Sequence, residues 1–241
     1  MKAVHARACP LQGAHKNVVT YGIRFCSLPG AMFSLQKLFS RDDQFFELLE
    51  ASAEECRASV QALKRAIASN SRTLTLDEFI SPRRKEKKIS AQLTELLARV
   101  SVTSLEREDI EALSDAFYKI PKTLEKFAQR YVLTRNELRD IDFSKHVELL
   151  EQAADITVQM LKELRRGFNM ANTAEQNANL QRVEGEADEL ILQVFKSELY
   201  SRKHDALKVI ILKDLYELLE KVVDRCRDAG NTICQIVLKS T

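Results

Sequence analysis

The sequence contains no tryptophan and only six glycines and four prolines among its 241 residues. Because glycine and proline supply many of the turns that connect strands, their scarcity argues against a β-rich fold. No apolar run approaches the ~20 residues that a membrane-spanning helix needs. The chain is instead 45% apolar and 30% charged, a composition that suits amphipathic helices.

Cysteine usage indicates a reducing environment. The number of cysteines is odd, and no two of them form a CxxC pair; they are Cys9, Cys26, Cys56, Cys226 and Cys234. This pattern favours neither a disulfide framework nor a zinc site. We therefore expect a cytoplasmic protein whose cysteines in the helical region pack as small apolar side chains.

The formal net charge of +2 comes from the first part of the chain. Residues 1–31 contain four basic residues and no acidic one, whereas the remaining 33 basic and 35 acidic residues nearly cancel. A body without a strong basic excess lacks the electrostatic footprint of a nucleic-acid-binding protein. We therefore expect no nucleic-acid partner.

Residues 1–31 also differ from the rest in pattern. They show no helical periodicity and no apolar stretch of the kind that a secretory signal contains. We interpret this segment as a disordered tail or a mis-assigned start, with Met32 as the natural first residue and 32–241 as the helical domain.

From Met32 onward, apolar residues recur every three or four positions, as on one face of a helix. The predicted helices span about 42–69, 76–102, 105–133, 143–168, 173–200 and 205–238. Long helices joined by short polar connections pack as bundles. The sequence therefore predicts an all-α fold of six long helices forming two packed three-helix bundles, with approximate halves 42–134 and 143–239. Ser40, Thr75, Thr103 and Asp205 are the expected helix caps.

Two rows of carboxylates lie in the fifth and sixth predicted helices. The first is Glu184-Gly-Glu-Ala-Asp188, and the second runs from Asp214 through Glu217, Glu220 and Asp224 to Asp228. Residues four apart share a helix face, where like charges cost roughly 0.2–0.5 kcal/mol per pair. Such a row is either a solvated surface or a site for a hard cation, and spacing alone leaves both readings open.

These motifs carry a family resemblance. Glu184-Gly-Glu-Ala-Asp188, followed by Glu220-Lys-Val-Val-Asp224-Arg-Cys-Arg-Asp-Ala-Gly-Asn231, resembles the second half of PhoU-like phosphate-transport regulators of the Pit-accessory type. Phe45-Phe-Glu-Leu-Leu49 and Arg107-Glu-Asp-Ile-Glu-Ala-Leu113 resemble the first half. The similarity covers about Met32 to the C-terminus and is most specific at the carboxylate rows.

The resemblance implies an all-helical fold of two three-helix bundles and a role beside inorganic phosphate transporters. It also implies metal, often iron or another divalent ion, held on the bundle surface by Glu/Asp-x-x-x-Asp pairs. Carried over by position, Glu184, Asp188, Glu220 and Asp224 match ligand positions, and Glu217 and Asp228 are further candidates.

The first half departs from the family pattern. Where the second helix would carry acidic residues, this chain reads Arg83-Arg-Lys-Glu-Lys87, and the third helix reads Tyr118-Lys-Ile-Pro-Lys122. Cations in place of carboxylates argue against a metal there. The basic cluster instead predicts an anion or partner docking surface, or a solvated helix face; it comprises Arg83, Arg84, Lys85, Lys87 and Lys88.

We therefore predict a non-enzymatic, bacterial-type regulator or accessory protein of inorganic phosphate transport that binds a Pit-type transporter at the inner membrane. The alternatives are a metal-free helical scaffold and a metal-dependent phosphohydrolase. The absence of a readable nucleophile and base argues against the phosphohydrolase. Self-association is left open.

Overall fold

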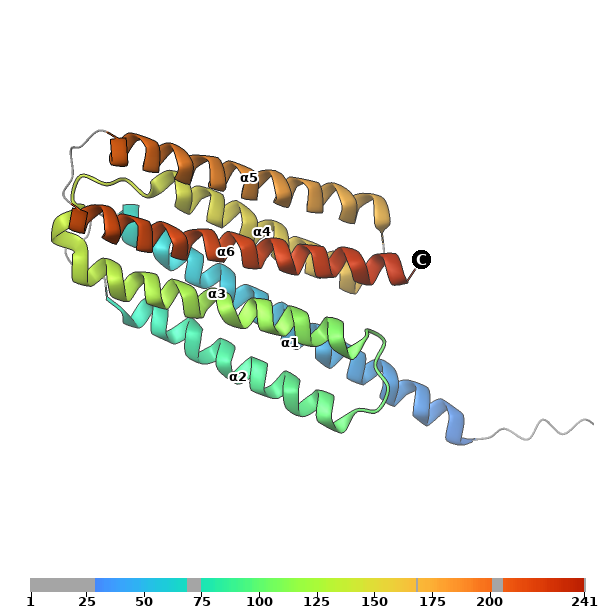
Figure 1. Cartoon of the computed structure of the whole chain (residues 1–241). Helices are drawn as coiled ribbons and strands as arrows, with labels where there is room; N and C mark the ends of the chain where they lie inside the picture. Colours follow the sequence, from blue (N-terminus) through green and yellow to red (C-terminus); the bar gives the residue numbers. More distant parts are fainter. Residues whose placement is uncertain (1–28, 69–74, 168, 201–205, 241) are drawn as a thin grey trace, which may run out of the picture.

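The computed structural model describes residues 29–68, 75–167, 169–200 and 206–240 (Figure 1). These residues form long α-helices and one short 3₁₀ helix, with no strand among them. The elements are α1 (Pro29–Ala68), α2 (Asp77–Arg99), α3 (Arg107–Thr134), η1 (Arg135–Leu138), α4 (Ser144–Arg166), α5 (Met170–Tyr200) and α6 (Ala206–Lys239).

The helices pack as two three-helix units. The first unit contains α1, α2 and α3, and the second contains α4, α5 and α6, with every pair of helices in contact inside each unit. The units join where α1 packs on α4 and α3 packs on α6. Figure 1 shows the consequence: α2 and α5 lie on opposite outer edges of the bundle. The predicted fold of two packed three-helix bundles is confirmed, whereas the proposed residue boundaries of the halves stay a prediction.

One hydrophobic core runs through both units. Fully buried members include Leu49 on α1, Leu113 on α3, Leu150 on α4, Val183 on α5 and Val222 on α6. Each such side chain contributes roughly 1.5–3 kcal/mol when it leaves water. Burial of the apolar face of each amphipathic helix therefore accounts for the close packing of the bundle.

The first helix begins earlier than the periodicity predicted. It starts at Pro29, and Ser40 lies inside it, so the expected start near Asp42 with Ser40 as its cap is wrong. Proline is well suited to a first helical turn because its missing N–H is not needed there. No proline follows Gly30 within this segment to break the helix. Residues 1–28 of the predicted tail lie outside the described residues.

Two other caps also differ from the prediction. Helices α2 and α3 begin after Leu76 and Glu106, and neither residue makes a side-chain capping bond. The Thr103 hydroxyl instead donates to the backbone oxygen of Leu105 at 2.6 Å, so it is used within its own turn. The remaining helix bounds agree with the predictions to within a few residues, and Asp205 lies outside the described residues.

Among the helices of the described residues, none is long and apolar enough to cross a membrane.

Candidate functional site

Four of the predicted ligand residues come together on neighbouring helices. Glu184 and Asp188 lie on α5, and Glu220 and Asp224 lie on α6, which packs against it. All four side chains are partly buried. We call this group the carboxylate face.

Close approach of α6 to its neighbours positions this face. A Cβ atom added at Gly230 would lie 2.5 Å from Leu180 Cδ2 of α5 and 3.5 Å from Met160 Sδ of α4. Beside this contact, Asn177 Nδ2 of α5 donates to Oδ1 of Asn231, the residue that follows Gly230 on α6, at 3.1 Å. A side chain at position 230 would have to displace Leu180, so glycine suits this close approach of the helices.

Burial and mutual repulsion perturb the carboxylate face. Burial raises the pKa of Asp188, and the charges of Glu184 and Asp224 raise it further. Burial likewise raises the pKa of Glu220, with Asp188 and Asp224 adding to the effect. The pKa of Asp224 is raised by burial, although the charge of Arg227 opposes the shift. Carboxylates of α5 therefore raise pKa values on α6, and Asp224 of α6 raises the pKa of Asp188 on α5.

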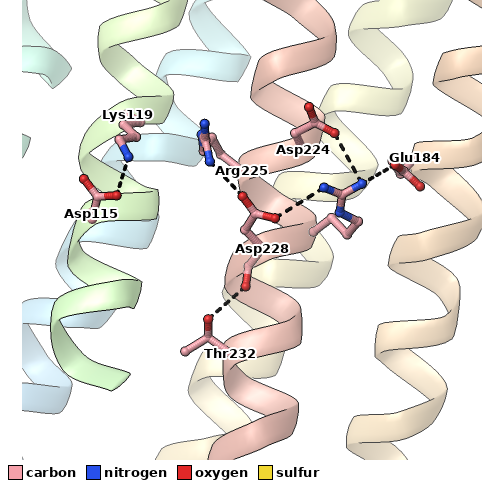
Figure 2. Close-up of polar contacts among 8 residues, drawn as sticks. Asp115, Lys119, Glu184, Asp224, Arg225, Asp228 and Thr232 are labelled. Atoms are coloured by element: carbon pink, nitrogen blue, oxygen red, sulfur yellow. Dashed lines mark hydrogen bonds and ion pairs between the residues drawn. The ribbon is translucent and has the colours of Figure 1, made fainter. Parts of the chain in front are cut away.

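Arg227 of α6 contacts Glu184, Asp224 and Asp228, three carboxylates that Figure 2 labels. Its Nη1 donates to Glu184 Oε1 across the interface and lies 3.5 Å from Asp224 Oδ1. Its Nη2 donates to Asp228 Oδ1 at 3.3 Å. One guanidinium therefore neutralises carboxylates of both helices, and the sequence pattern did not single out Arg227 as a member of this site.

The two additional ligand candidates already have partners. Glu217 accepts a hydrogen bond from Lys213 one turn earlier, which lowers the pKa of its carboxyl group. Asp228 accepts from Arg225 Nη1 at 2.8 Å as well as from Arg227. Neither side chain needs an external cation for charge balance.

The metal implied by the family resemblance does not fit this arrangement as it stands. Carboxylate oxygens are suitable donors for a hard cation. Within the described ranges, however, no group of three or more His, Cys, Asp or Glu side chains is arranged to hold a metal ion. Arg227 supplies positive charge at the place where such an ion would be expected, so metal binding stays a prediction.

In the first unit, basic side chains gather where α2 lies beside α3. Arg83 and Lys87 lie on α2, and Tyr118 and Lys122 lie on α3. Arg83 Nη2 donates to the Tyr118 hydroxyl at 2.6 Å, and its guanidinium carbon lies 4.1 Å from the centre of the ring. Lys122 Nζ lies 5.5 Å from the same centre. The Arg83 hydrogen bond is the main cause that lowers the pKa of Tyr118, and the charges of Lys122 and Lys87 add to it.

The predicted basic cluster divides into cations with and without partners. Arg83 contacts Tyr118, and Lys85 Nζ lies 3.2 Å from Glu55 Oε1 on α1. Arg84, Lys87 and Lys88 are exposed and form no ion pair with the described residues. We call Arg83, Arg84, Lys87, Lys88 and Lys122 the cationic face.

A buried carboxyl group lies beneath the cationic face. Glu86 is 0% exposed, and its Oε1 accepts a hydrogen bond from Ser52 of α1 at 2.9 Å. Its Oε2 has no hydrogen-bond partner and lies 4.0 Å from Arg83 Nη1, which also has none. The sequence analysis read Glu86 as part of a charge run. Its spacing was informative, however, because it lies seven residues from both Phe79 and Leu93 on the buried stripe of α2.

The comparisons with known proteins agree with this fold. No protein-family model matches the chain. It is 23% identical to the UPF0111 protein YkaA of Bacillus subtilis (strain 168), over 83% of this chain and 98% of that protein. It is 25% identical to a protein of Rhizobium meliloti (strain 1021) named "Putative pit accessory protein", over 85% of this chain and 97% of the relative.

Two solved structures from Shewanella oneidensis MR-1 are similar in fold. A PhoU-like protein superposes with a TM-score of 0.63 at 16% identity, covering 83% of this chain and 99% of the other. A second, described as a PhoU-like phosphate regulatory protein, superposes with a TM-score of 0.60 at 16% identity and the same coverage. The resemblance drawn from the carboxylate motifs is therefore confirmed at the level of the fold: this chain has a PhoU-like fold.

Proposed function

We propose that this chain is a non-enzymatic accessory protein of inorganic phosphate transport that acts in the cytoplasm by binding a Pit-type transporter. Support comes from two sources. Its relative in Rhizobium meliloti is named as a pit accessory protein, and a neighbour in fold is described as a phosphate regulatory protein. Both matches span nearly the whole of the other chain, so the likeness is not confined to a single motif.

The cationic face carries the structural part of the proposal. Arg84, Lys87 and Lys88 are exposed on α2 without an acidic partner among the described residues, while Arg83 and Lys122 flank Tyr118. Unpaired cations on one helix repel each other, and an acidic partner relieves that repulsion. The face therefore suits an acidic cytoplasmic segment of a transporter.

One observation supports a form of this role that needs no metal. Arg227 neutralises carboxylates from α5 and α6 without help from an external ion. Arg227, Glu184 and Asp224 can thus link α5 to α6 as an internal ion-pair network. Metal content measured in protein purified without chelator distinguishes the metal-free form from one in which Glu184, Asp188, Glu220 and Asp224 bind an iron or another divalent ion.

Capture of the transporter tests the proposal directly. The tagged chain is mixed with detergent-solubilised membranes, and the inorganic phosphate transporter is measured in the bound fraction at rising salt. We expect specific capture that weakens with ionic strength, because exposed charges are screened over about 8 Å at physiological salt. Replacing Arg84, Lys87 and Lys88 by Gln should reduce capture strongly.

A matched variant controls for net charge. Lys145 and Arg166 of α4 and Lys196 of α5 are exposed and lie in the second unit, away from α2. Replacing these three by Gln removes the same charge from other surfaces. Equal loss of capture in both variants would mean that only net charge matters, and absence of the transporter from the bound fraction at every salt concentration would contradict the proposed partner.

A further inference from the structure

A carboxyl group buried inside the first unit lies directly under its cationic face. Glu86 is inaccessible to water, and only one of its oxygens is hydrogen-bonded, to Ser52. The other oxygen, Oε2, faces Arg83 Nη1 at 4.0 Å, too long for a hydrogen bond. Both atoms are buried and lack a hydrogen-bond partner. Keeping such a buried carboxylate ionised costs free energy, so Glu86 takes up a proton more readily than an exposed glutamate does.

Few other charged or titratable groups lie close to Glu86. From α1, Glu55 and the buried thiol of Cys56 interact with it. From α2 itself, Arg83 is the nearby cation. From α3, Tyr118 lies beyond Arg83 and is bonded to the same guanidinium. Lys85 is directed to Glu55 rather than to Glu86.

Arg83 therefore connects the interior with the surface. One of its terminal nitrogens, Nη2, donates to the Tyr118 hydroxyl, while the other, Nη1, points toward Glu86. When Glu86 is ionised, its negative charge partly offsets the positive charge of Arg83. The positive electrostatic potential of the cationic face is then lower. When Glu86 is neutral, the whole charge of Arg83 is available at Tyr118.

We propose that the cationic face of α2 and α3 binds acidic protein segments in a proton-linked manner, with Glu86 as the group that takes up the proton. This inference rests on the proposed docking role of that face and adds its regulation. Linkage makes the effect reciprocal: a bound carboxylate partner favours the neutral form of Glu86, and a neutral Glu86 favours the partner.

Binding of a fluorescent oligoglutamate peptide to the full chain tests the inference. The affinity is measured at about pH 6 and about pH 8, because burial raises the pKa of Glu86 to about 7. We expect binding about threefold to fivefold tighter at the lower pH, the effect of one partly screened charge several ångströms from the ligand. Calorimetry in two buffers of different ionisation enthalpy should detect uptake of a fraction of a proton on binding.

Two variants identify the group responsible. Glu86→Gln keeps the size of the side chain and should bind equally well at both pH values, with no proton uptake. Ser52→Ala removes the hydrogen bond that favours ionised Glu86, so it should move the transition to higher pH. The second variant also keeps the test decisive if Glu86→Gln folds poorly.

The outcomes separate the two proposals. Binding that is the same at both pH values, or a pH dependence that persists in Glu86→Gln, overturns the inference and leaves the docking face intact. If the peptide binds at neither pH, both the inference and the acidic chemistry assigned to the partner are overturned. Tighter binding at low pH that disappears only in the Glu86 variant supports it.

Discussion

Arg227 on α6 donates a hydrogen bond to Glu184 on α5, and its guanidinium also contacts Asp224 and Asp228 of its own helix. A single side chain thus ties together the two helices that carry the carboxylate face. The family resemblance predicts an external cation beside these carboxylates. In this chain, the guanidinium of Arg227 lies beside Glu184 and Asp224.

Removal of this guanidinium should destabilise the second unit. In Arg227→Gln, the carboxylates that it neutralised are left to repel one another at neutral pH. Because Arg227 and Glu184 are 31% and 20% exposed, we expect a moderate loss of about 1 kcal/mol in the free energy of unfolding. Thermal unfolding monitored by circular dichroism measures it, and the loss should shrink in acid as the carboxylates become neutral.

Arg225→Gln is the matched control for that substitution. Arg225 is similarly exposed, and its one ion pair with the described residues is to Asp228, one turn along its own helix. Its loss should cost no more than a few tenths of a kcal/mol. Equal destabilisation by the two variants would show that Arg227 has no special role between the helices.

Any metal that the purified chain carries should be held by the carboxylate face. The double variant Asp188→Asn, Asp224→Asn removes one charge from each helix of the pair and should abolish metal content without loss of helicity. Elemental analysis of protein purified without chelator provides the measurement. Full occupancy in the double variant would assign the metal to other residues.

Glu86 should make stability depend on pH in the direction opposite to an ordinary salt-bridged acid. Burial raises the pKa of Glu86 from 4.5 to about 7, so the folded chain holds this proton more tightly than the unfolded chain. Its stabilising contribution is therefore present below about pH 4.5 and is lost as the pH rises toward 7. The loss is on the order of 3 kcal/mol at most.

Glu86→Gln should consequently raise the melting temperature at about pH 8 and change it little at about pH 5, where the wild-type side chain is largely neutral. Glu95→Gln provides the control, because Glu95 lies on the exposed side of the same helix. A Glu86 variant that is less stable than wild type at both pH values would indicate that the carboxyl group is needed for its hydrogen bond and not neutralised by burial.

Gly230 should tolerate no side chain. A Cβ atom there would lie 2.5 Å from Leu180 Cδ2 and 3.1 Å from Asn177 Oδ1, so Gly230→Ala must displace these side chains within the contact between α5 and α6. Overpacking of this kind typically costs 1–3 kcal/mol, more than the gain of about 1 kcal/mol from better helix propensity. Urea unfolding should show net destabilisation, whereas Gly185→Ala, with no atom within 4 Å of the added Cβ, should stabilise the chain.

The fold was predictable from sequence because it depends on periodicity. Apolar residues such as Leu49, Val60 and Leu63 repeat at helical spacing, and burial of that stripe decides the architecture whatever the details of the helix ends. The caps were not predictable in the same way. Ser40 has the chemistry of a cap, yet it lies inside α1, because the residues before it continue the helix.

The candidate site was predictable only in part. Spacing brought Glu184 and Asp188 to one face of α5 and Glu220 and Asp224 to one face of α6, but it could not show that Arg227 reaches across the interface. The partner of a long side chain depends on how neighbouring helices pack, which the sequence pattern of one helix does not contain. Glu86 differs, since its register with buried Phe79 and Leu93 was visible in the sequence.

Inorganic phosphate uptake by cells tests the central claim most directly. Radiolabelled phosphate uptake is compared in cells with and without this chain, and in cells without it that are supplied with either the wild-type chain or the Arg84, Lys87 and Lys88 to Gln variant. The account predicts that loss of the chain changes the rate of uptake, that the wild-type chain restores it, and that the variant, present at the same level, does not. Uptake that is unchanged by loss of the chain would contradict the account.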